Sequence, residues 1–332
     1  MTSTKPRLDI LAVGESLRDV FYLIDDATLS CSINKDRCLL CLEYADKIPV
    51  RQVVKVPAAG NSANAAVGAA RLGLRTGLIS WVGDDYAGRH LREALRKEKV
   101  DLKFLVEDKK LPTSEATIIN YQGEKTQLVY FQPRSYSVPE CQEARCLYYS
   151  AMGAKHASVD KKIFEFLGCF PAMKLVFQPG TTHIKSGLTA IKKLIAKSHM
   201  LILNKDEAEQ LLADGERTMC SLLDKFIKLG AKTAIITDGK NGADAFDGKT
   251  HWHMPAFDGK PVETTGAGDS FACGVTVAML KGLDMEEALR WGSANAWSVI
   301  HEIGPQKGLL ASAGMKKVLK KFSKIKAETH RH

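Results

Sequence analysis

Short apolar runs recur along the chain and alternate with amphipathic stretches. The first run covers residues 8–14, and similar runs follow at 76–82, 147–150, 174–177, 200–203 and 233–237. Short apolar runs bounded by turn residues are typical of strands buried on both faces. Stretches with helical spacing separate these runs, at 61–72, 89–99, 160–168, 184–196 and 205–229. The alternation predicts an α/β fold, with a doubly wound, mostly parallel sheet flanked by helices.

Two segments break this alternation. From about residue 20 to 56, and again over 115–120 and 126–131, apolar and polar residues alternate in short runs, as in half-buried strands. The turn Gln122-Gly123-Glu124 predicts a hairpin between the last two runs. We expect the two segments, roughly 17–56 and 113–133, to pair as a small inserted β lid. Because no repeat or low-complexity linker divides the chain, residues 1–332 are expected to form one domain.

Composition and charge favour a soluble globular protein that does not bind nucleic acid. Hydrophobic residues at 45% and charged residues at 26% match a soluble globular protein. No apolar run approaches the ~20 residues that span a bilayer, so no membrane partner is expected. The N-terminus lacks the apolar stretch of a signal peptide, which predicts a cytoplasmic location. Much of the net charge of +9 lies on lysines of a C-terminal amphipathic stretch, which indicates a solvated helix face rather than a nucleic-acid partner.

Eight cysteines are scattered along the chain. Without a secretion signal they are expected to be reduced thiols rather than a disulfide framework. Cys31, Cys38 and Cys41 include one Cys-x-x-Cys pair and could supply three zinc ligands, but no nearby residue closes the site. Whether these three bind zinc stays open at this point.

The strongest chemical signal is the run Glu-Thr-Thr-Gly-Ala-Gly-Asp-Ser-Phe at 263–271. Gly266 and Gly268 leave backbone N–H groups uncovered where a helix begins, and the helix dipole adds positive potential. Such a turn stabilises a transferring phosphoryl group. Asp269 is placed to take a proton from an attacking hydroxyl. Taken alone, the same pattern also fits a helix that merely follows a Gly-rich turn.

Three other turns lie where a ligand could bind. Asn61 and Asn64 carry amides that can orient a polyhydroxylated substrate. Asn204 and Glu207 follow a strand end, where they could order metal-bound water near phosphates or equally form a helix capping box. The turn at 237–242 fits a nucleotide contact or a plain hairpin turn.

Together these residues resemble the ribokinase (pfkB) family of sugar and nucleoside kinases, over nearly the whole chain. The segment 60–88, with Ala70-Arg71-Leu72-Gly73 and Val82-Gly83-Asp84-Asp85, looks like the N-terminal signature of the family. The segment 263–271 looks like its C-terminal signature. The resemblance implies a ribokinase-like fold and ATP-dependent, in-line phosphoryl transfer assisted by Mg²⁺.

The resemblance also implies a role for each matching residue. Asp269 would be the base, and the anion hole would be formed by Gly266, Ala267 and Gly268. Hydroxyl groups of the substrate would be bound by Asp19, Gly60 and Asn64. The nucleotide would be contacted by Asn204, Thr237, Gly239, Gly242 and Asn295. Glu207 would hold Mg²⁺ through water, whereas Glu263 and Thr265 belong to a loop that binds a monovalent cation such as K⁺.

The acceptor side departs from the family pattern. Leu17, Ala59 and Gln178 stand where the family often has Asn, Gly and Asn, and Glu263 stands where Asp is usual. These departures weaken the prediction of the substrate rather than that of the reaction. The first hypothesis is a kinase of a small sugar or sugar derivative, whose acceptor and K⁺ dependence stay open. A nucleoside kinase with aromatic lid residues around the base is one alternative. A sugar-phosphate kinase, with Arg18 and Arg134 facing the anion, is another.

Two further classes of protein agree less well with the sequence. A non-catalytic sugar- or nucleotide-binding relative would tolerate loss of Asp269 or its glycines, and all of these are present. A nucleic-acid binder rests on net charge alone. The resemblance also implies a homodimer formed through the lid.

Overall fold

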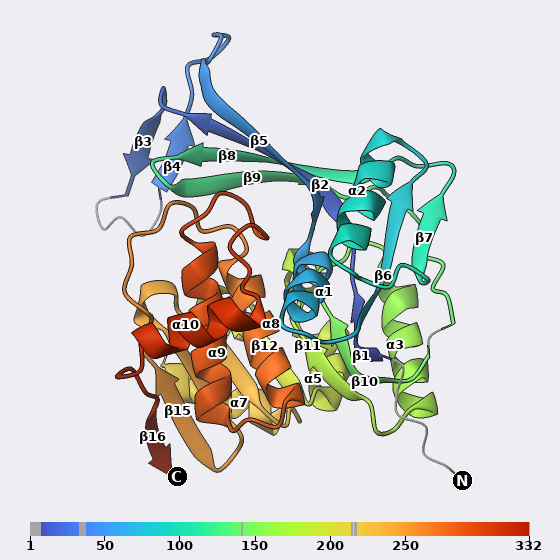
Figure 1. Ribbon diagram of the computed structural model, residues 1–332, viewed down its shortest axis with the longest axis vertical. Helices are drawn as coiled ribbons and strands as arrows, with labels where there is room; N and C mark the ends of the chain where they lie inside the picture. Colours follow the sequence, from blue (N-terminus) through green and yellow to red (C-terminus); the bar gives the residue numbers. More distant parts are fainter. Residues whose placement is uncertain (1–7, 33–37, 141, 214, 216–217, 332) are drawn as a thin grey trace.

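A ten-stranded sheet forms the centre of the computed structural model, which describes residues 8–331 except 33–37, 141, 214 and 216–217 (Figure 1). Neighbouring strands run parallel from β13 to β7, whereas β13 to β16 pair antiparallel at one edge. The strands, in spatial order, are β16 (Glu328–Arg331), β15 (Thr250–Met254), β14 (Ala243–Phe246), β13 (Ala234–Thr237), β12 (Met200–Asn204), β11 (Lys174–Phe177), β10 (Ala144–Tyr149), β1 (Leu8–Val13), β6 (Thr76–Gly83) and β7 (Leu105–Asp108).

Helices cover both faces of this sheet. Strand β1 shows why: Ile10 and Ala12 pack into one hydrophobic cluster, and Leu11 and Val13 into another on the opposite face. The first cluster includes residues of α1 (Asn61–Arg71), α2 (Tyr86–Lys97), α8 (Ala267–Leu280), α9 (Met285–Val299) and α10 (Ser312–Lys321). The second includes residues of α3 (Ala157–Cys169), α4 (Thr181–Ser186), α5 (Leu188–Lys197), α6 (Lys205–Leu212) and α7 (Met219–Lys228). The predicted doubly wound architecture is confirmed.

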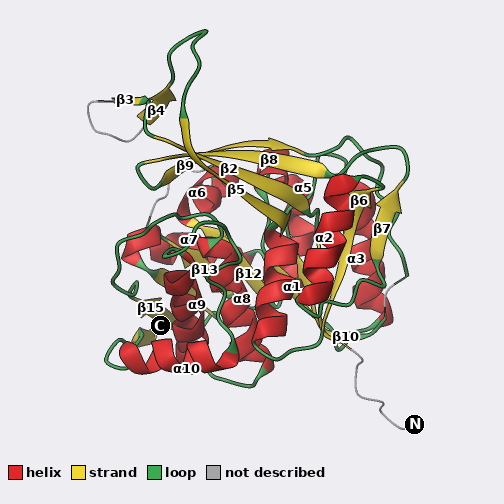
Figure 2. Cartoon of the chain, turned by 45° about the horizontal axis from the view of Figure 1, so that its top comes forward, coloured by secondary structure: helices red, strands yellow, loops and turns green. Residues whose placement is uncertain are grey.

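A second, four-stranded sheet lies across one end of the large sheet (Figures 1 and 2). We call it the small sheet. Its strands, in spatial order, are β5 (Val50–Ala59), β2 (Leu17–Ile24), β8 (Ser114–Tyr121) and β9 (Glu124–Tyr130). Because β2 begins soon after β1 ends at Val13, the small sheet faces the carboxyl ends of the parallel strands.

Two predicted helices are each divided in the structure. The stretch 205–229 forms α6 and α7, because Ala213 adopts a left-handed conformation with φ of 50° and ends α6. The stretch 184–196 forms the end of α4 and most of α5, separated by Gly187 with φ of 82°. Both predictions of a single helix were wrong. The helical spacing of apolar residues continues across Ala213 and Gly187, although the backbone changes direction there.

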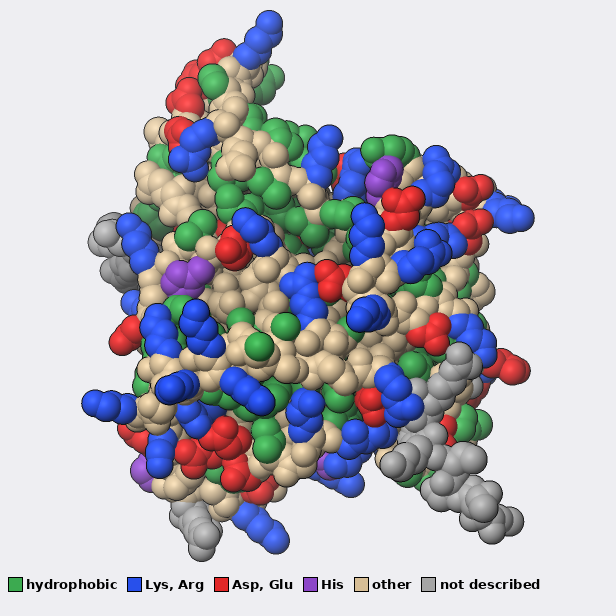
Figure 3. Space-filling model, in the orientation of Figure 1, with side chains coloured by type: hydrophobic (Ala, Val, Ile, Leu, Met, Phe, Trp, Pro, Cys, Tyr) green, Lys and Arg blue, Asp and Glu red, His purple; other side chains and the backbone are tan. Residues whose placement is uncertain are grey.

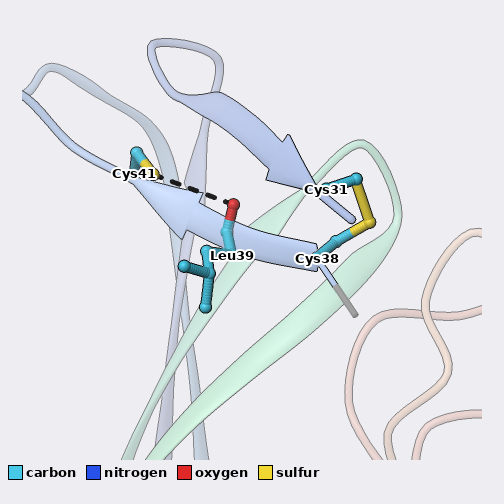
Figure 4. Close-up of a disulfide and its surroundings, with 4 residues drawn as sticks. All are labelled: Cys31, Cys38, Leu39 and Cys41. Carbon is cyan, nitrogen blue, oxygen red and sulfur yellow. Dashed lines mark hydrogen bonds between the residues drawn. A yellow bond between two sulfur atoms is a disulfide. The ribbon is translucent and has the colours of Figure 1, made fainter. Parts of the chain in front are cut away.

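The expectation of reduced thiols is wrong for two of the eight cysteines. Those described as free thiols are Cys41, Cys146, Cys169, Cys220 and Cys273, and Cys141 lies outside the described residues. Cys31 and Cys38 form a disulfide that joins the strands β3 (Thr28–Cys31) and β4 (Cys38–Cys41) of a projecting hairpin (Figure 4). Cys41 instead contacts the carbonyl oxygen of Leu39. Since two of the three thiols are used by the disulfide, the structure does not support the zinc alternative. No helix among the described residues is long and apolar enough to cross a membrane.

Candidate active site

A cavity of about 710 Å³ lies between the carboxyl edge of the large sheet and the small sheet. Ligands of open α/β sheets usually bind at this edge. The cavity is lined by most of the residues predicted from sequence, namely Asp19, Gly60, Asn64, Asn204, Glu207, Thr237, Thr265, Gly266, Gly268 and Asp269. Segments that are far apart in the chain therefore meet in one site.

Asp269, in the first turn of α8, is held by two amides. Its Oδ2 accepts a hydrogen bond from Nδ2 of Asn64 at 2.8 Å, and its Oδ1 accepts one from Nε2 of Gln178 at 3.1 Å. Burial raises the pKa of Asp269, while the hydrogen bond from Asn64, the charge of Lys125 and the hydrogen bond from Gln178 lower it. A carboxylate held this way can accept a proton from a hydroxyl group placed in the cavity.

Two amide side chains extend this network away from the cavity. Oε1 of Gln178 accepts a hydrogen bond from the hydroxyl of the buried Tyr148. Oδ1 of Asn64 accepts one from Nε2 of Gln306 at 3.0 Å. Because both oxygens are occupied, the amide orientations are fixed and both N–H donors point at Asp269.

The glycine turn before α8 leaves donors open to the cavity. Gly266 has φ of 81°, and a Cβ there would lie 2.4 Å from Cβ of Pro305, so this position requires glycine. A Cβ on Gly268 would meet no atom within 4 Å. The N–H of Ala267 donates to the carbonyl oxygen of Thr264 at 3.3 Å. Within the described residues, the N–H groups of Gly268 and Asp269 have no acceptor, so they face the cavity as free donors.

Asn204 and Glu207 form a reciprocal capping box at the start of α6. The N–H of Glu207 donates to Oδ1 of Asn204 at 2.8 Å, and the N–H of Asn204 donates to Oε2 of Glu207 at 3.0 Å. Burial raises the pKa of Glu207 to about 7, helped by the nearby charges of Asp269 and Asp206. The cap therefore holds a carboxylate at the cavity wall, where it can bind a cation.

Thr237 lies next to this pair, at the end of the neighbouring strand β13. Its hydroxyl donates to the carbonyl oxygen of Leu203 at 3.4 Å. Gly239 and Gly242 follow in the adjoining turn, and both have positive φ. They do not line the cavity themselves.

Asp19 lies on the small sheet and points into the cavity. It is 5% exposed, and burial raises its pKa to about 7; Lys125 lowers the pKa, and Asp269 and Glu263 raise it further. A buried carboxylate needs donors around it, and the hydroxyl groups of a bound polyol would provide them.

Glu263 and Asn295 are fully buried and do not line the cavity. Glu263 accepts hydrogen bonds from the N–H of Thr265 at 2.6 Å and the N–H of Gly304 at 3.4 Å, which ties two loops together. Asn295 donates to the carbonyl oxygen of Ser270 at 2.8 Å and accepts from the N–H of Leu310 at 3.0 Å. These contacts give Asn295 a structural role in this arrangement, outside the cavity.

The two arginines expected as anion contacts do not line the cavity. Arg18 pairs with Glu115, and the buried Arg134 pairs with Glu15 at 3.3 Å and Asp108 at 3.3 Å. Sequence reasoning missed the cations that do line it, Lys125 on β9 and Lys185 on α4. A lysine in an alternating strand, or at the end of a short helix, carries no signal that separates it from a solvated lysine.

Comparison with known proteins gives consistent matches. A model of the pfkB family carbohydrate kinases matches residues 22–311. An ATP-dependent 6-phosphofructokinase of Thermoanaerobacterium thermosaccharolyticum is 25% identical over 306 residues, which cover 87% of this chain and 86% of that protein.

Solved structures agree with this match. A ribokinase of Arabidopsis thaliana complexed with ribose and ATP has a TM-score of 0.76 at 20% identity, covering 94% of this chain and 99% of that one. A nucleoside kinase of Methanocaldococcus jannaschii has a TM-score of 0.74 at 21% identity, covering 96% and 100%. The fold is therefore ribokinase-like, as predicted.

Proposed function

Because the chain belongs to the pfkB family of carbohydrate kinases and is a kinase, we propose that it transfers the γ-phosphoryl group of ATP to a hydroxyl group of a small sugar or sugar derivative. One observation supports this most strongly. Asp269 lies beside the free N–H donors at the start of α8, so a base and an anion hole share one corner of the cavity.

In the proposed reaction the acceptor hydroxyl approaches Asp269. The hydroxyl proton passes to the carboxylate as the hydroxyl oxygen forms a bond to the γ-phosphorus. The bond from the γ-phosphorus to the bridging oxygen breaks, and ADP leaves with that oxygen and the electron pair of the broken bond. Asn64 and Gln178 hold the carboxylate in place, while Gly266, Ala267 and Gly268 form the turn that receives the phosphoryl oxygens. Asp19, Gly60 and Asn64 would bind the other hydroxyl groups of the acceptor.

The nucleotide would extend from α8 toward β12 and β13. Asn204 and Thr237 line that part of the cavity, and Gly239 and Gly242 continue its wall. Lys185 lines the cavity from α4, which packs against α6, so it would contact the phosphate groups. Asn295 would affect the nucleotide only through the position of α8. Binding of ATP by the Arabidopsis ribokinase supports ATP as the donor.

Two cations fit the donors that are present. Mg²⁺ would neutralise phosphate charge and would be held near Glu207 through water, since this half-buried carboxylate has no cationic partner among the described residues. Glu263 is fully buried and likewise lacks a cationic partner in the described part of the chain. A monovalent ion such as K⁺, held by Glu263 and Thr265, would neutralise that charge.

We also propose that the small sheet acts as a lid within a single domain of residues 1–332, and that two copies pair through its outer face. Alternation along the strands puts Val53, Leu128 and Tyr130 on the face away from the cavity, where they are 46%, 59% and 60% exposed. Hydrophobic side chains gather over these strands (Figure 3). A self-complementary apolar patch of this kind suits a two-fold dimer.

A nucleoside acceptor is less well supported. A base needs apolar or aromatic walls, and Phe131 is the only aromatic side chain of the described residues that lines the cavity. The test is acceptor-dependent formation of ADP from ATP across neutral sugars, nucleosides, sugar acids and sugar phosphates, with and without K⁺. We expect turnover with a sugar or sugar derivative. Absence of turnover with every acceptor would overturn the proposed function, and turnover with nucleosides alone would favour the alternative.

A further inference from the structure

The inner face of the small sheet is ordered in rows across its strands. Asp19 on β2 lies opposite Ala116 on β8, which lies opposite Val129 on β9. Four residues further along β2, the row consists of Leu23, Asn120 and Lys125. Since a strand advances about 3.3 Å per residue, the Cα atoms of the two rows are roughly 13 Å apart. The inner face therefore has a carboxylate in one row and polar donors in the other.

The donors of the second row have no partner among the residues that the structure describes. Asn120 is 5% exposed, yet its Nδ2 has no hydrogen-bond acceptor among the described residues. Lys125 lines the active-site cavity and forms no ion pair with any described residue. A buried amide N–H without an acceptor costs about 1–3 kcal/mol, so such a donor usually has a ligand or water. Asn120 lines a neighbouring cavity at the edge of the small sheet rather than the active-site cavity itself. It is the cross-strand neighbour of Lys125 on the same face, so one acceptor group between them can satisfy both.

We propose that Lys125 and Asn120 form a subsite for an anionic group, a carboxylate or a phosphate, carried by the acceptor. The inference rests on the proposed kinase function and names its substrate class. The acceptor would be a polyhydroxylated compound whose anionic group lies at the end remote from the hydroxyl that meets Asp269. Asp19 would bind hydroxyl groups between the two ends.

The charges of the cavity favour this arrangement. Asp19, Glu207 and Asp269 line it with carboxyl groups, so an anionic acceptor needs a cation of its own. Lys125 is the cation on the lid side, whereas Lys185 lies near the phosphate side. Lys125 also lowers the pKa values of Asp19 and Asp269, so its positive charge acts on groups inside the cavity. An ammonium group binds either kind of anion as a compact point charge.

The test compares acceptors and variants in the full-length protein. Steady-state kinetics with ATP would be measured for neutral sugars, sugar acids and sugar phosphates, using the wild type, Lys125→Ala and Asn120→Ala. Lys55→Ala is the matched control, because Lys55 is an exposed lysine on the outer face of the same small sheet. Thermal unfolding of each variant reports whether the fold is kept.

We expect the best acceptor to be anionic. A comparison of kcat/KM for sugar acids and sugar phosphates would show which of the two anionic groups the subsite binds. Losing one charged contact should lower kcat/KM for that acceptor about 10- to 100-fold in Lys125→Ala, mainly through KM. Neutral sugars should lose much less, because they lose only the effect of the Lys125 charge on Asp19 and Asp269. Asn120→Ala should act in the same direction but less strongly, without lowering the unfolding temperature.

A neutral sugar as the best acceptor would overturn the subsite while leaving the kinase function intact. So would an equal loss for neutral and anionic acceptors in Lys125→Ala. Absence of turnover with every acceptor is a separate result, which would overturn the proposed function itself and the subsite with it.

Discussion

Nδ2 of Asn64 donates a hydrogen bond to Oδ2 of Asp269 across 2.8 Å, although 205 residues separate them in the chain. The contact exists because α1 and α8 pack closely: a Cβ on Gly68 would lie 2.7 Å from Sγ of Cys273. The amide donates to the ionised form of the carboxylate and so lowers its pKa.

Asn64→Ala removes this hydrogen bond. Since this hydrogen bond favours the ionised carboxylate, its loss should raise the pKa of Asp269. The base is active when ionised, so the acid limb of the pH profile of kcat should move to higher pH. Gln210→Ala, which removes an exposed amide from α6, should leave the limb in place. An unshifted limb in Asn64→Ala would contradict the assignment of Asp269.

Glu207 should make the Mg²⁺ requirement depend on pH. Its pKa is raised to about 7 by burial, so the carboxyl group is increasingly protonated below that pH and binds a cation less well. Glu207→Gln keeps an oxygen for the N–H of Asn204 and should fold normally. It should need about tenfold more Mg²⁺ for half-maximal activity and lose the pH dependence. Titrations of Mg²⁺ at several pH values check this, and an unchanged requirement would contradict it.

Two glycines of the same turn should respond differently to alanine. Gly268→Ala meets no atom within 4 Å, so it should fold normally but fill the space for the phosphoryl group and lower kcat about 100-fold. Gly266→Ala must adopt a positive φ, which costs about 1–2 kcal/mol, and would clash with Pro305. It should lower both activity and the unfolding temperature. Full activity of Gly268→Ala would rule out an anion hole here.

The outer face of the small sheet should control the oligomeric state. Leu128→Glu places a negative charge on the exposed apolar patch. In a two-fold dimer both copies contribute this patch, so two like charges would be buried in the interface. Sedimentation should show the wild type at twice 36.4 kDa and Leu128→Glu as a monomer. Leu283→Glu, at an exposed leucine in the turn between α8 and α9, is the control and should stay dimeric. A monomeric wild type would contradict the proposal.

Much of the fold was predictable, because buried parallel strands are short apolar runs whose period differs from that of helices. Gly266 and Asp269 could be proposed as site residues for a similar reason, since a helix start that binds an anion needs particular residues in a fixed order. The breaks at Ala213 and Gly187 were missed, because apolar spacing does not register a change of backbone direction. The Cys31–Cys38 disulfide was missed because its partners meet only through the β3–β4 hairpin.

The supporting residues of the site were harder to predict. Gln306 and Lys125 reach the site from a loop and from the small sheet, and only tertiary structure brings them near Asp269. Asn295 differs from these two residues. The resemblance predicts a nucleotide contact, whereas its side chain is fully buried and bonded to backbone groups of Ser270 and Leu310.

The most direct test of the central claim is a comparison of ATP binding and phosphoryl transfer in Asp269→Asn. The amide is nearly isosteric with the carboxylate but cannot accept the proton. We predict a loss of kcat of at least ~100-fold, because general-base catalysis contributes about 10²–10⁴-fold, with the Kd of ATP changed only a few-fold. Asp26→Asn, an exposed substitution on the small-sheet side, should keep full activity. Substantial transfer by Asp269→Asn with ATP bound normally would contradict the account.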